Sequence, residues 1–148
     1  MTIDGERQSV RLMIYEWIVR RGVAPSTHDI AEACAMPEPC VRRVVRELAE
    51  AHVVVLQPDS IDLWAAPPFS AVPSGFKVRA REGSWFAPCA WDAFGIPAAL
   101  EADAEIEAAC AETGEAIRCG VRGGREFGTA VIHMLVPAAH FWDDIIYT

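Results

Sequence analysis

Apolar residues recur every three or four positions through the first third of the chain, which is the spacing of amphipathic helices. The spacing predicts three helices, which span residues 9–21, 28–35 and 38–51. Gly22 ends the first helix, and the hydroxyls of Ser26 and Thr27 can cap the start of the second. The predicted buried stripe of the third helix consists of Val41, Val44, Val45 and Leu48. This part of the chain is therefore expected to be helix-rich.

Two short β-type runs follow the helices, at residues 53–56 and 61–64. Pro58, Asp59 and Ser60 lie between them and are typical turn residues, so the two runs are expected to form a hairpin. Three helices followed by a hairpin make a winged-helix-like arrangement, and we assign residues 1–66 to an N-terminal module of this kind.

Short apolar runs separated by turn residues make up the rest of the chain. The predicted strands span residues 77–81, 85–87, 104–109, 116–121 and 129–136. A short helix is expected to start near Pro88 and to be interrupted at residues 95–97. The predicted fold class is α+β, with the winged-helix-like module packed on a mixed or antiparallel β domain, residues 67–148, that carries a short active-site helix.

Charge narrows the possible partners. The net charge is −8 over 148 residues, and both halves are acidic: residues 1–66 hold seven Lys/Arg against ten Asp/Glu, and residues 67–148 hold six against eleven. Arg42, Arg43 and Arg46 on the third helix could contact DNA, but Glu47 and Glu50 stand at helical spacing to partner them. Because nucleic-acid binding depends on neutralising phosphates, the acidic balance favours a solvated helix face over a nucleic-acid partner.

The chain has no apolar run near the ~20 residues of a membrane helix and no secretory signal pattern at its start. It contains five cysteines, at positions 34, 40, 89, 110 and 119, and none of them forms a CxxC pair. An odd number of cysteines without a signal indicates reduced thiols and disfavours a structural zinc site. These features predict a soluble cytoplasmic protein that does not act at a membrane.

The best candidate for chemistry is the pair Cys89 and Asp92. Pro88 suits the first turn of a helix, so Cys89 is expected beside free backbone N–H groups that lower the pKa of a thiol. Asp92 follows three residues later and shares its helix face. A soft sulfur beside a carboxyl that can donate a proton can act as a metal-binding and acid pair. The simpler alternative is a core cysteine with a capping or paired aspartate.

Four segments resemble the alkylmercury lyase (organomercurial lyase) family. They are PFSAVPSGFKV at 68–78, SWFAPCAWDAFGIPAAL at 84–100, the stretch from Cys110 to Glu115, and FWDDIIYT at 141–148. The N-terminal helical module is also typical of that family. CAWDAFGIPA is the most specific of these motifs, and the resemblance extends over nearly the whole chain.

The resemblance implies protonolysis of a carbon–mercury bond, which gives Hg(II) and a hydrocarbon, as in mercuric resistance and detoxification. By position, Cys89 matches the cysteine that captures mercury and Asp92 matches the aspartate that protonates the departing carbon. Cys110 matches a family cysteine that is taken as structural. Mercury is then substrate and product, no cofactor is implied, the partner is a small organomercurial or soft metal, and a mercuric reductase would accept the product.

The family's second catalytic cysteine follows directly after the segment that FWDDIIYT resembles, and the sequence ends there at Thr148. Either the sequence is a piece of a longer lyase, or it is a short homologue whose activity is lost or reassigned. Cys119 is one candidate for the second thiol, and His133 and His140 are alternative ligands. Three hypotheses stay open: a lyase, a non-catalytic thiol binder of soft metals or organometals with the same fold, and a winged-helix DNA-binding regulator.

Overall fold

The computed structural model describes residues 3–147. The chain forms two compact units, Met1–Val72 and Pro73–Thr148, each with its own core. No helix within residues 3–147 has both the length and the apolar character that crossing a membrane requires.

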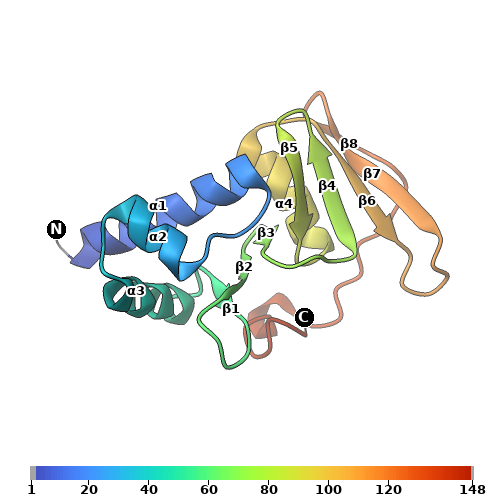
Figure 1. Cartoon of the computed structure of the whole chain (residues 1–148). Coiled ribbons are helices and arrows are strands. Elements are labelled where there is room, and N and C mark those ends of the chain that lie inside the picture. The colour runs from blue at the N-terminus through green and yellow to red at the C-terminus, as the bar shows by residue number, and fades with distance from the viewer. Residues whose placement is uncertain (1–2, 148) are drawn as a thin grey trace. The chain divides into compact units, whose positions relative to one another are not determined.

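Three helices open the first unit (Figure 1): α1 (Ile3–Arg21), α2 (Thr27–Cys34) and α3 (Glu38–Glu50). The start of α2 is fixed by a capping box, in which the Asp29 amide donates to Ser26 Oγ at 3.1 Å and the Ser26 amide donates to Asp29 Oδ2 at 2.8 Å. Pro37 is the N-cap of α3. The three predicted helices are confirmed, with the first beginning six residues earlier than the spacing indicated.

The helices pack through apolar stripes. The stripe of α3 is buried throughout and consists of Val41, Val44, Val45 and Leu48. Val10, Ile14 and Ile18 of α1 are likewise buried. Trp17 stays half-buried instead, with the Arg21 guanidinium 3.8 Å from the centre of its ring.

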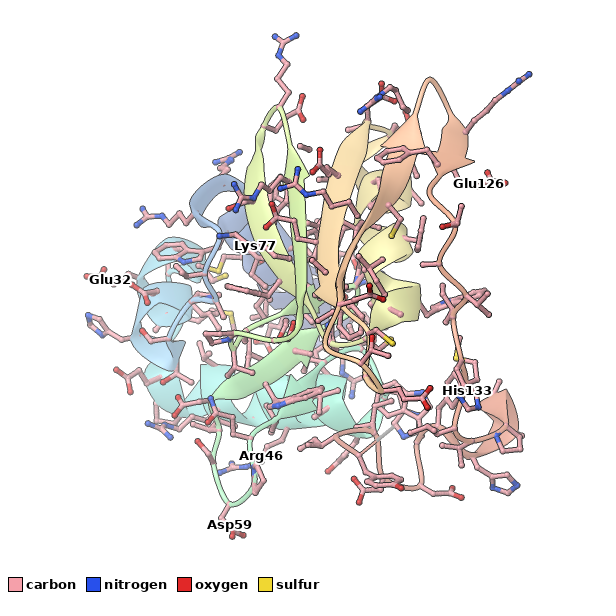
Figure 2. The ribbon with its side chains drawn as sticks, turned by 90° about the vertical axis from the view of Figure 1, so that its right-hand side faces the viewer. Glu32, Arg46, Asp59, Lys77, Glu126 and His133 are labelled. Atoms are coloured by element: carbon pink, nitrogen blue, oxygen red, sulfur yellow. The ribbon has the colours of Figure 1, made fainter. Side chains whose placement is uncertain are left out.

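The hairpin after the helices is also confirmed. β1 (Val55–Leu56) pairs antiparallel with β2 (Leu63–Ala66), and β2 pairs antiparallel with β3 (Phe69–Ser70). Asp59 lies at the tip of the loop between β1 and β2 (Figure 2), where its φ of 54° is a left-handed conformation that aspartate tolerates.

The second unit is an antiparallel sheet with one helix. Its strands lie in the order β5 (Gly83–Ala87), β4 (Phe76–Ala80), β6 (Ala104–Ala109), β7 (Ala116–Arg122) and β8 (Arg125–Phe127). Helix α4 (Ala90–Leu100) contacts β4, β5, β6 and β7. Together with the helices of the first unit, these strands confirm the α+β class.

One row of buried side chains crosses four strands of this sheet. Trp85 pairs with Val78, Val78 with Ile106, and Ile106 with Cys119. Neighbouring positions on the strands carry charges on the opposite face, such as the pair Arg79–Glu107 at 3.1 Å. The apolar row therefore faces α4, whose Ala93 and Ile96 are also buried.

Two predictions for this unit are wrong. Residues 129–136 form no strand. The turn at Gly123 and Gly124 brings β8 onto the edge of β7, which leaves that edge occupied. Gly128, with φ of 102°, then directs the chain away from the sheet. The segment continues irregularly to a short 3-10 helix (Ala138–His140). Helix α4 is not interrupted at residues 95–97, because the burial of Ile96 and Pro97 holds its last turn together.

Candidate active site

The start of α4 positions the predicted pair. Cys89 is the N-cap of the helix, in an extended conformation, and its Sγ accepts a hydrogen bond from the Asp92 amide at 3.5 Å. The Cys89 carbonyl accepts from the Ala93 amide at 3.0 Å and begins the helical ladder. The helix starts at Ala90, so Pro88 lies before the N-cap and not in the first turn as the sequence predicted.

The two reactive groups contact each other directly. The Cys89 thiol donates to Asp92 Oδ2 across 3.5 Å, and both residues are half-buried. One turn of helix therefore holds a sulfur and a carboxyl within proton-transfer reach of each other, while both keep some access to solvent.

Burial raises the pKa of both groups. For Asp92, loss of hydration outweighs the hydrogen bond from Cys89, which acts in the opposite direction on the pKa. For Cys89, loss of hydration is the largest cause, and the charge of Asp92 and its side-chain hydrogen bond raise the pKa further. The Asp92 amide, which is the second-largest cause, and the Trp91 amide lower the pKa, but they do not cancel the effect of burial. The predicted lowering of the Cys89 pKa is therefore wrong in direction: the helix N-terminus acts on the thiol, but burial exceeds it.

An apolar pocket of about 400 Å³ opens beside the same turn. Its wall is formed by Trp91 of α4 and by six side chains of the irregular C-terminal segment. These six are Met134, Leu135, Val136, Pro137, Ala138 and Phe141. The strand predicted at 129–136 hides the part of the wall that this segment forms, and Pro137 is the residue that argues against a strand there.

The other thiols are held elsewhere. Cys119 lies in the buried row of the sheet, and burial raises its pKa. Cys110 begins the loop between β6 and β7, where bonds from the Thr113 side chain and nearby amides lower its pKa. Its amide donates to the Glu115 carbonyl at 2.8 Å, and its carbonyl accepts from the Gly114 amide at the same distance, so Cys110 orders this loop.

No metal-binding group of three or more His, Cys, Asp and Glu residues occurs within residues 3–147. The structure thus does not gather Cys119 with Cys89 and Asp92 into such a group. His140 pairs with Asp143 at 2.8 Å, which places Asp143 in a surface turn. His133 lies exposed on the irregular segment after β8 (Figure 2).

The basic face of α3 is paired with carboxylates. Arg43 contacts Glu6 at 2.6 Å and Glu47 at 2.8 Å, and Arg7 contacts Glu47 at 2.8 Å. These partners raise the pKa of Arg43 and lower that of Glu47. Arg42 lies 3.9 Å from Glu38, while Arg46 is exposed. Carboxylates on α1 and α3 thus offset much of the positive charge that a DNA-reading helix would present.

An antiparallel sheet with a half-buried thiol–carboxyl pair at the start of its helix defines an α+β protein with a cysteine–aspartate site. The family model described as Alkylmercury lyase (MerB) matches residues 69–148, which include this site, and the chain belongs to that family.

A solved structure, described as the mercury-bound form of MerB2, is similar to this chain. The TM-score is 0.63 at 26% sequence identity, and the match covers 82% of this chain. The chain spans 58% of the length of that protein. Among curated proteins, none matches this sequence.

Proposed function

We propose that this protein cleaves the carbon–mercury bond of organomercurials by protonolysis. The observation that carries the proposal is the contact between Cys89 Sγ and Asp92 Oδ2, 3.5 Å apart at the start of α4, in a chain of the alkylmercury lyase family. The mercury-bound state of the similar solved protein adds support.

The first step is capture of the substrate, R–Hg–X. The Cys89 thiol gives its proton to the Asp92 carboxylate, its sulfur forms a bond to mercury, and X⁻ leaves. Hg(II) is a soft acid and thiolate is the soft ligand in the site, so a sulfur–mercury bond favours loss of the proton despite the raised pKa of the thiol. Asp92, whose pKa burial also raises, is suited to hold that proton.

The second step breaks the carbon–mercury bond. The electron pair of this bond takes the proton from Asp92, the hydrocarbon R–H leaves, and Asp92 returns to the carboxylate. Mercury stays on Cys89 as Hg(II), and two small-molecule thiols, R'SH, then displace it as Hg(SR')2. One of their protons returns to the Cys89 sulfur, and the other goes to solvent. Each cycle consumes one proton, which is first taken from the Cys89 thiol.

This chemistry fits a detoxification role in mercuric resistance. All five cysteines are free thiols. Thiols stay reduced in the cytoplasm, where this role would place the protein. The product Hg(II) would pass to a mercuric reductase, whose substrate it is.

Phenylmercury with an excess of a small thiol tests the proposal, with benzene release measured by gas chromatography. Capture is read separately: after a short pulse of iodoacetamide, peptide mass mapping shows which cysteines mercury had protected. We expect Cys89→Ser to abolish benzene release, and Asp92→Asn to leave Cys89 protected while benzene release falls at least a hundredfold.

Cys110→Ser is the matched control and should keep full activity, because Cys110 orders a loop away from the pair. Benzene release by Cys89→Ser would overturn the assignment. A lasting adduct on Cys89 of the wild-type chain with no benzene would show a thiol binder of organometals and not a lyase.

A further inference from the structure

We infer that the apolar pocket beside Trp91 receives the organic group of the bound organomercurial, and that Trp91 gives the site a preference for aryl over small alkyl groups. This inference rests on the proposed function, because it concerns the substrate that Cys89 captures.

Trp91 lies both in the turn that carries the Cys89–Asp92 pair and in the wall of the apolar pocket. It stands between Cys89 and Asp92 in the first turn of α4. The indole is 65% exposed, which is unusual for so large an apolar side chain and leaves its face open to a ligand. A group bound to mercury on Cys89 therefore starts two positions along the chain from this aromatic surface.

The chemistry of the pocket matches an apolar group. All seven side chains that line it are uncharged and apolar, and its volume of about 400 Å³ accommodates a phenyl or alkyl substituent. A second pocket, at the other end of α4, differs because Glu101 and Asp103 form part of its wall. The apolar pocket thus suits R and not the charged or thiol ligands of mercury.

Coordination geometry separates the organic group from the sulfur. Hg(II) with two ligands is linear, so R lies on the far side of the metal from Cys89 Sγ. An aryl group placed there can stack against indole, whereas a methyl group leaves most of the pocket empty. Aromatic pairs gain free energy beyond area burial, and their typical strength corresponds to roughly a two- to tenfold preference.

The test measures affinity and does not need turnover. In an Asp92→Asn background, which keeps bound substrate intact, phenylmercury and methylmercury are titrated separately against a fixed small thiol. A pulse of iodoacetamide then records the concentration that half-protects each cysteine. The phenyl-to-methyl preference at Cys89 should fall roughly two- to tenfold with Trp91→Ala and recover with Trp91→Phe.

Two controls lie in the same molecule. The preference at Cys110 should not change in any variant, and Phe94→Ala, which removes an aromatic ring from the second pocket, should leave Cys89 unaffected. An unchanged preference at Cys89 in Trp91→Ala overturns the inference. Light scattering identifies the alternative occupant. If the wild-type chain is a dimer, and Trp91→Ala is a monomer with an unchanged preference at Cys89, the pocket surface joins two copies and the inference is wrong.

The outcomes for the two proposals are distinct. If Cys89 is never protected, both the proposed function and the pocket assignment are wrong. If Cys89 is protected but the wild-type chain releases no benzene, the lyase proposal is wrong, while the change in preference at Cys89 still decides the role of Trp91.

Discussion

Cys89 and Asp92 affect each other's ionisation within one turn of α4. The charge of Asp92 and its side-chain hydrogen bond are both causes of the raised Cys89 pKa, in addition to burial. Asn keeps the backbone amide that bonds to Cys89 Sγ but removes the negative charge. We therefore expect Asp92→Asn to lower the Cys89 pKa, although burial should still hold it above its ordinary value.

The rate of iodoacetamide alkylation at Cys89, followed against pH by peptide mass mapping, measures this change. Since thiolate is the reacting form, the Cys89 profile should move to lower pH in Asp92→Asn, with faster alkylation at every pH below the wild-type midpoint. The Cys110 profile in the same sample is the control and should stay fixed. A Cys89 profile that moves to higher pH would contradict the origin assigned to the shift.

At this scale the sequence locates the residues but not their energetics. The spacing of Cys89 and Asp92 predicts that they share a helix face, and the structure places them 3.5 Å apart. The direction of the Cys89 pKa depends on how much water the neighbouring side chains exclude, and local spacing does not contain that information. Cys119 shows the same limit, because its place in a buried row follows from its register with Ile106 on β6.

The close approach of β6 and β7 depends on a glycine. A Cβ at Gly120 would lie 2.1 Å from the Ala104 carbonyl oxygen, and the φ there, 155°, is one that other residues rarely adopt. Gly120→Ala should therefore push the two strands apart and destabilise the second unit by about 2–4 kcal/mol, from backbone strain and overpacking together.

Gly124→Ala is the matched comparison, because Gly124 also has a positive φ, of 71°, but nothing lies within 4 Å of its Cβ position. It should cost only about 1–2 kcal/mol. Urea unfolding of both variants, followed by tryptophan fluorescence, to which the buried Trp85 of this sheet contributes, gives the two free energies. Equal losses would show that the contact between β6 and β7 does not limit substitution at position 120.

Helices with a regular spacing of apolar residues are predicted well from the sequence, whereas strands that depend on pairing with another strand are not. The stripe of α3 and the N-cap at Ser26 fix helices that the structure confirms. Residues 129–136 have the composition of a strand, but β8 already pairs with β7 through Gly120 and Phe127, so no edge is left for them there. The strand prediction for this segment therefore also hides the pocket wall that the segment forms.

The charge of the whole molecule bears on nucleic acid. Helix α3 is the helix that would read DNA if the predicted winged-helix module used this mode of binding, yet Arg43 contacts Glu6 and Glu47, and the net charge is −8. A phosphate contact would have to displace those carboxylates while the summed field repels the duplex.

We therefore expect no electrophoretic shift of mixed-sequence duplex DNA with the chain at 10 μM in 0.15 M salt. Non-specific binding of basic domains has Kd values of about 10⁻⁴ to 10⁻⁶ M under such conditions, and an acidic surface should bind more weakly, with a Kd above about 10⁻⁴ M. As a positive comparison, replacing Glu6 and Glu47 with Gln should free the guanidinium of Arg43 and raise the net charge by two, so any latent affinity should appear first in that variant. A shift by the wild-type chain that weakens with salt and disappears when Arg42, Arg43 and Arg46 are replaced would instead establish α3 as a DNA-binding helix.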